Sequence, residues 1–158
     1  MYRFGHVGAA LFCYAPIGAV ISALGEPALA LVGAIVAVSL STLPDLDEFL
    51  PIDHRGPTHT IWFAASVGLL ATALGGIVGF TIGRPVVVAA VVGGAATLAI
   101  VSHLLADVIT PMGVRPFYPL STWHYSFDIT PAKNPRANTT MLGVGIAFSA
   151  LCQAFVLL

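Results

Sequence analysis

The chain has 158 residues, of which 58% are hydrophobic and only 8% are charged. Soluble domains carry roughly 25% charged residues, so this composition excludes a water-exposed globular protein and indicates an integral membrane protein. The formal net charge of −1 gives no support for binding nucleic acid, which we exclude as a partner. The length favours one compact bundle, so we expect a single domain over residues 1–158.

Five apolar segments are long enough to cross a bilayer, which requires about 20 residues. In chain order they are residues 7–25, 27–43, 60–83, 85–106 and 140–158. Gly25 before Pro27, and Gly83 before Pro85, fit a helix end followed at once by a helix start. We therefore expect an all-α membrane protein, a bundle of five transmembrane helices with a long loop between the fourth and fifth helices.

Basic residues are distributed unevenly between the two ends of this bundle. With five spans, the side of the N-terminus holds Arg3, Arg55, Arg115, Lys133 and Arg136. The opposite side holds only Arg84. The positive-inside rule then predicts a protein of the inner membrane with its N-terminus and its long loop in the cytoplasm, and its C-terminus outside.

Histidine and aspartate residues occur where spans meet their loops, and the topology puts all of them on the predicted cytoplasmic face. They are His6, Asp45, Asp47, His54, His59, His103 and Asp107. Ionisable side chains at the mouth of a helical bundle are costly unless something binds them. We interpret the seven residues as candidate ligands of a metal site at the membrane surface.

The aspartates of the second span lie in the motif PDLD, where Pro44 limits continuation of the helix. Crowded carboxylates raise one another's pKa unless a cation neutralises them, although a solvated acidic loop is an alternative interpretation. In the motif HRGPTH, Gly56 permits a sharp turn and Pro57 suits a first helical turn, which puts His59 near the start of the third span.

The motif SHLLAD ends the fourth span. His103 and Asp107 are four residues apart and share one helix face, so they can bind one ion or bridge two. A hydrogen-bonded pair at a helix end is the alternative. Mixed nitrogen and oxygen ligands suit zinc, with manganese or iron as alternatives. Because the candidates outnumber the four ligands of a structural zinc site, we expect a catalytic site with one to three divalent ions.

Other polar residues near this face could act on a substrate. Asp47 or Glu48 could accept a proton during catalysis. Arg55, Arg115 and His124 could hold an anionic headgroup.

The polar motifs together resemble a known family. They are GH at 5–6, LPDLD at 43–47, HRGPTH at 54–59 and SHLLADVITPMG at 102–113. This set resembles a bacterial and archaeal family of membrane-bound, metal-dependent hydrolases, some of which are LexA-regulated inner-membrane proteins. The resemblance runs from Gly5 to about Leu120 and implies that the motif histidines and aspartates are metal ligands. The chain differs at Glu48, where the family often has another polar residue or a histidine.

A weaker resemblance concerns the order of the ligands. Their succession resembles the helical superfamily of zinc-dependent phospholipase C and single-strand nucleases, which cleave phosphate esters at a metal cluster. The matching residues are His6, Asp45, His59, His103 and Asp107. The remaining histidine and glutamate ligands of that superfamily have no clear counterpart here.

From these observations we predict an integral membrane metal-dependent hydrolase that cleaves a phosphoester of a lipid or another amphiphile at the cytoplasmic face. A non-catalytic metal-binding scaffold is one alternative. A transporter is a second, disfavoured because the centres of the spans carry no charge. A metalloprotease is disfavoured because the chain has no H-E-x-x-H motif. The sequence does not specify the oligomeric state.

Overall fold

The computed structural model describes residues 1–158 as an all-helical bundle without strands. Its long helices are α1 (Arg3–Ala23), α2 (Pro27–Leu40), α3 (Ile61–Thr81), α4 (Pro85–Val108) and α5 (Pro135–Leu157). Two short 3-10 turns, η1 (Pro44–Phe49) and η2 (Pro57–His59), lie between α2 and α3. All five long helices, with α2 counted on through η1, are long and apolar enough to span a membrane. The predicted fold class is therefore confirmed.

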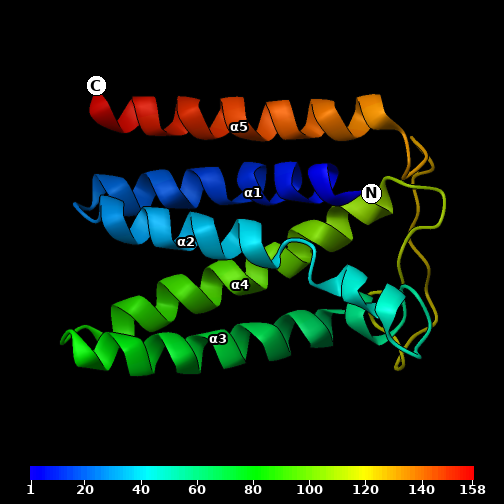
Figure 1. Ribbon diagram of the computed structural model, residues 1–158, viewed down its shortest axis with the longest axis horizontal. Coiled ribbons are helices and arrows are strands. Elements are labelled where there is room, and N and C mark those ends of the chain that lie inside the picture. The colour runs from blue at the N-terminus through cyan, green and yellow to red at the C-terminus, as the bar shows by residue number, and fades with distance from the viewer.

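The helices run along one common direction, with α5 and α3 on the two outer edges (Figure 1). α1 packs mainly on α5, and α3 packs mainly on α4, while α2 contacts both α1 and α4. α4 crosses the bundle obliquely and ends close to the start of α1 (Figure 1). Because the N-terminus and the two longer connections share this end of the bundle, residues distant in sequence meet there (Figure 1).

The helix boundaries differ from the predicted spans at two starts. α1 begins at Arg3 rather than near residue 7, so His6 lies inside the helix. α5 begins at Pro135 rather than near residue 140, because the side chain of Asn134 caps it by accepting hydrogen bonds from the backbone of Arg136 and Ala137. The hydropathy window misses both starts because polar residues occupy the first turns.

The opposite end of the bundle holds two tight turns, as predicted. Gly25 and Gly83 have φ of +85° and +72°, a region that glycine enters without steric cost. Glu26 and Arg84 form an ion pair that links the two turns, with Nη1 of Arg84 donating to Oε2 of Glu26 at 2.9 Å. This hydrogen bond lowers the pKa of the Glu26 carboxyl.

The helices approach one another through small residues. A Cβ at Gly75 would crowd Val88 and Val92 of α4, and a Cβ at Gly145 of α5 would overlap the backbone of Gly8 in α1. Close backbone packing of this kind holds helices together in lipid, where apolar side chains gain little from leaving the solvent. Most of the buried apolar side chains are alanines, and, apart from Ile100 and Pro44, the largest fully buried side chains are polar.

Candidate metal centre

The polar core lies where α1, the two 3-10 turns and the C-terminal half of α4 meet. The side chains of His6, His59, His103 and Asp107 are 0% exposed, and that of Asp45 is 26% exposed. α1 supplies His6, η1 supplies Asp45 and η2 supplies His59, while His103 and Asp107 lie one turn apart on α4. Such burial is costly unless each polar group finds a partner.

Four donor atoms enclose a small space at the centre. Nε2 of His59 lies 3.5 Å from Oδ1 of Asp45 and 3.6 Å from Oδ2 of Asp107. Nε2 of His103 lies 3.4 Å from the same Asp45 oxygen and 3.5 Å from the same Asp107 oxygen. The two Nε2 atoms are 3.1 Å apart. Tetrahedral ligands of one zinc ion, at 2.0–2.1 Å from it, are separated by about 3.4 Å, so these spacings fit a single ion.

The other oxygens of the same carboxylates face His6. Nε2 of His6 lies 3.6 Å from Oδ2 of Asp45 and 3.6 Å from Oδ1 of Asp107. Each carboxylate thus offers one oxygen toward His59 and His103 and its other oxygen toward His6. Ligand atoms of His6, Asp45, His103 and Asp107 all lie within 4.8 Å of one another. His6 is therefore a fifth candidate ligand, beside a carboxylate oxygen, Oδ1 of Asp107, that also contacts Arg55 and the amino group of Met1.

Nε2 of His6 also contacts the backbone of Met1. This atom lies 2.6 Å from the carbonyl oxygen of Met1, and Nδ1 of the same ring is buried without a partner. Nε2 donates to that carbonyl only when it carries the proton. His6 can therefore bind an ion through Nε2 only in the tautomer that has its proton on Nδ1.

Asp107 gives the clearest indication of a cation. Its Oδ1 accepts a hydrogen bond from Nη2 of Arg55 at 2.9 Å and contacts the amino group of Met1. Its Oδ2 is buried without any hydrogen-bond partner and faces the Nε2 atoms of His59 and His103. A buried carboxylate oxygen without a donor is costly, and a cation among these atoms would satisfy it. The residues present therefore fit a divalent ion, and the donor set suits zinc, manganese or iron.

His59 and His103 are each held in orientation by a contact to Nδ1, the ring nitrogen that faces away from the centre. Nδ1 of His103 lies 2.8 Å from the carbonyl oxygen of Ser41, to which it donates. Nδ1 of His59 lies 3.0 Å from the hydroxyl oxygen of Thr58 and 3.2 Å from Oδ2 of Asp47. Because the Thr58 hydroxyl donates its own hydrogen to Asp47, its oxygen accepts from Nδ1 of His59. An acceptor on Nδ1 keeps the proton there and leaves the Nε2 lone pair toward an ion.

Asp47 does not join the four-atom set. Its Oδ1 lies 2.8 Å from Nδ1 of His54. Its Oδ2 accepts hydrogen bonds from the hydroxyl of Thr58 at 2.8 Å and from the backbone N–H of Arg55 at 2.9 Å. Asp47 is 1% exposed, so both of its oxygens are occupied by protein donors. Its geometry is that of an orienting group behind His59.

The remaining candidates lie outside the centre. His54 is 36% exposed, and its Nε2 lies 3.9 Å from Oε1 of Glu48, which is 58% exposed. The structure thus does not bring His54 to the group around Asp107. The guanidinium of Arg55 donates to Thr110 at 3.0 Å and to Gly113 at 2.8 Å, besides Asp107, so its donors are largely occupied.

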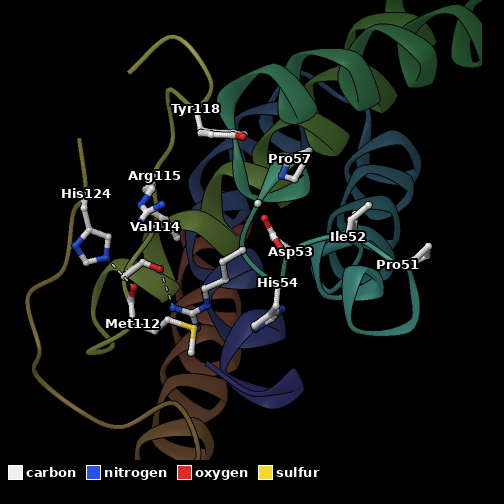
Figure 2. Close-up of a pocket in the computed structure, with 13 residues that line it drawn as sticks. Pro51, Ile52, Asp53, His54, Pro57, Met112, Val114, Arg115, Tyr118 and His124 are labelled. Atoms are coloured by element: carbon white, nitrogen blue, oxygen red, sulfur yellow. Dashed lines mark hydrogen bonds between the residues drawn. The ribbon is translucent and has the colours of Figure 1, made fainter. Parts of the chain in front are cut away.

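Arg115 and His124 line a polar pocket of about 530 Å³ next to the centre. Figure 2 shows them on one side of the pocket and Asp53 and His54 on the other. Nε2 of His124 lies 2.7 Å from the carbonyl oxygen of Met112, while Arg115 forms no ion pair. The pocket contains none of the five residues that converge on the centre.

Sequence reasoning missed three polar groups that support the site. Thr58 lies next to His59 inside HRGPTH, and its hydroxyl contacts both Asp47 and His59, so its place in the motif was the available signal. The hydroxyl of Thr110 accepts a hydrogen bond from Arg55 and donates one to the backbone carbonyl of Asp107. Thr110 lies three residues after Asp107, within the same motif. Ser41 acts through its backbone carbonyl, for which no residue type gives a signal.

A family model described as YdjM inner membrane protein matches residues 1–158, the whole chain. The chain belongs to the YdjM inner membrane protein family. The inner-membrane part of the resemblance is thereby confirmed, and the bilayer is the environment of this YdjM-family protein. No curated protein and no solved structure matches the chain.

Proposed function

We propose that this YdjM-family protein is a membrane-embedded, metal-dependent hydrolase that cleaves a phosphoester of a lipid or another amphiphile. The observation that carries the proposal is Asp107, a buried carboxylate with one oxygen free of hydrogen bonds and facing two histidines. A stability role alone would need only one closed set of four ligands. Here His6 extends the set on the far side of both carboxylates, so that five candidate ligands surround the two aspartates.

In this proposal, His59, His103, Asp45 and Asp107 hold one divalent ion, most simply zinc. A second ion between His6 and the other oxygens of the two carboxylates would have to displace Arg55 or the amino group of Met1, which contact Oδ1 of Asp107. A divalent ion here supplies Lewis acidity toward a phosphoryl oxygen and lowers the pKa of water.

Glu48 is the proposed proton acceptor. Glu48 and Asp45 line the same cavity, and Glu48 is exposed to it. Asp47 was the alternative acceptor and a predicted ligand, but hydrogen bonds from His54, Thr58 and Arg55 occupy its oxygens. We therefore propose that Asp47 positions His59 and His54 rather than exchanging protons with substrate.

Arg115 and His124 are the proposed binding residues for an anionic part of the substrate. Arg115 has no carboxylate partner, and its planar guanidinium suits a phosphate group. Arg55 lines the same pocket but is held by Asp107, so we propose that it joins the substrate pocket to the metal centre. The site is proposed to face the cytoplasm, as the excess of basic residues on that side predicts.

The test is hydrolysis by protein purified in a neutral detergent. Phosphomonoester, phosphodiester and phospholipid substrates would be offered before chelation, after chelation and after return of zinc, manganese or iron. Asp107→Asn removes a ligand, and Asp128→Asn, at an exposed residue whose φ of 49° asparagine tolerates, is the matched control.

The proposal requires hydrolysis that chelation abolishes, that a metal restores, and that only Asp107→Asn eliminates. Hydrolysis that survives complete chelation would contradict the metal mechanism. Full metal occupancy without hydrolysis of any ester in the panel would favour the non-catalytic scaffold.

A further inference from the structure

A second cavity, of about 840 Å³, reaches the metal centre from the loop end of the bundle. Among the residues that converge on the centre, Asp45 lines it, and Glu48 and His54 line it as well. The pocket that holds Arg115 contains none of the converging residues. This second cavity therefore gives a substrate direct access to Asp45.

Two cations from opposite ends of the chain line the mouth of this cavity. Arg3 comes from the first turn of α1, and Lys133 comes from the segment just before α5. Both residues are exposed, and neither forms an ion pair within the protein. Of the other charged residues in the lining, Arg55 is paired with Asp107, and Asp45 faces the histidines. Glu48 is the one exposed carboxylate opposite the two free cations.

The same mouth carries large apolar side chains. Leu46, Phe49 and Met112 line the cavity and are 51%, 82% and 61% exposed. Exposed apolar side chains of this size are favourable at the end of a membrane bundle only where lipid chains cover them. The cavity thus combines two unpaired cations with exposed apolar side chains at the loop end of the bundle.

We propose that this cavity is the entrance for an anionic phospholipid-like amphiphile, whose phosphate is held on entry by Arg3 and Lys133, before the contact with Arg115 and His124 proposed above. Its acyl chain lies over Leu46, Phe49 and Met112. This inference rests on the proposed function for the hydrolysis of the bound lipid. It adds that the lipid is anionic and that it enters through this cavity. Arg3 and Lys133 form charge-assisted hydrogen bonds with the phosphate oxygens.

The experiment measures binding by the full-length protein in a neutral detergent. Dodecyl phosphate, inorganic phosphate and dodecylphosphocholine are titrated by calorimetry into the wild type and into the double variant Arg3→Gln, Lys133→Gln. Arg136→Gln is the control, because Arg136 is an exposed cation at the start of α5 that lines neither cavity. Lys133→Gln alone, in a loop, serves if the double variant does not fold.

We expect dodecyl phosphate to bind at least tenfold more tightly than either inorganic phosphate or dodecylphosphocholine. The double variant should lose at least tenfold in affinity for dodecyl phosphate, Lys133→Gln alone should lose severalfold, and Arg136→Gln should lose nothing. Unchanged affinity for dodecyl phosphate in both the double variant and Lys133→Gln would overturn the inference. Inorganic phosphate binding as tightly as dodecyl phosphate would also overturn it, because the site would then hold free phosphate rather than a lipid.

The same titration with Asp107→Asn separates this inference from the proposed hydrolysis. That variant keeps the cavity mouth, so selective binding of dodecyl phosphate is expected without any turnover. If the metal-loaded wild type binds dodecyl phosphate selectively but hydrolyses no ester in the panel, the proposed function is refuted and the lipid entrance stands.

Discussion

Oδ2 of Asp47 lies 3.2 Å from Nδ1 of His59, the ring nitrogen that faces away from Asp45 and Asp107. The hydroxyl of Thr58 contacts both atoms: it donates to Asp47 and accepts from Nδ1 of His59, at 3.0 Å. Asp47 and Thr58 together therefore hold the proton of His59 on Nδ1 and leave the lone pair of Nε2 toward the centre. Thr58 and the backbone of Arg55 hold the same carboxylate in place. Asp45 and Asp47, two residues apart, thus have different positions relative to the centre.

This difference can be measured by replacing each aspartate with asparagine. Asp45→Asn removes a donor oxygen from the centre, so we expect it to abolish stoichiometric metal binding. Asp47→Asn weakens only the orientation of His59, so we expect a loss of about 10–100-fold in affinity. Zinc titration against a competing chromophoric chelator measures both. Equal and complete loss in the two variants would make Asp47 a ligand itself.

The two arginines near the centre should differ in their effect on kinetics. Arg115→Ala removes a cation that faces an open pocket, so we expect KM to rise with little change in kcat. Arg55→Ala also leaves the buried Asp107 without its donor, so we expect kcat to fall and bound metal to decrease. Steady-state rates and metal content of both variants test this. A rise in KM alone for Arg55→Ala would restore it as a simple substrate-binding residue.

The packing of α5 on α1 predicts opposite effects for two neighbouring glycines. A Cβ at Gly145 would overlap the backbone of Gly8, so Gly145→Ala should destabilise the protein by about 1–3 kcal/mol. A Cβ at Gly143 meets nothing within 4 Å, so Gly143→Ala should be neutral or stabilising by up to about 1 kcal/mol through helix propensity. Unfolding in mixed detergent measures both changes. Equal stability of the two variants would place the α1–α5 contact elsewhere.

Membrane orientation has its own test. Ile82, in the turn before α4, is 61% exposed at the end of the bundle opposite the metal centre. In a background where Cys13 and Cys152 are replaced by alanine, Ile82→Cys should react with an impermeant maleimide added outside intact cells. Protection in intact cells, with labelling only after lysis, would reverse the predicted orientation.

The sequence was sufficient for the architecture because hydropathy alone sets the number of spans, and Gly–Pro pairs mark the tight turns. It was also sufficient for the convergence of His59, His103 and Asp107, since two spans separate the second loop from the fourth and so put both loops on one face. The start of α5 was readable too, because Asn134 before Pro135 is a capping signal that the hydropathy window ignored.

The sequence was insufficient for the role of each polar residue. A 3-10 turn has three residues per turn, so residues two apart, such as Asp45 and Asp47, are rotated by about 240° from each other. The left-handed backbone of Arg55, with φ of 60°, directs its guanidinium toward Asp107, and no residue pattern predicts that conformation. The motifs alone therefore could not distinguish the residues that face the centre from those that support them.

The central claim is that the residues around Asp107 bind a divalent metal ion, and metal analysis of the purified protein tests it most directly. Mass spectrometry of metals in detergent-purified wild type, Asp107→Asn and the control Asp128→Asn would give the stoichiometry of each protein. We predict one or two equivalents of zinc, manganese or iron in the wild type and the control, and none in Asp107→Asn. A folded wild-type protein without metal, even after incubation with all three ions, would contradict the account.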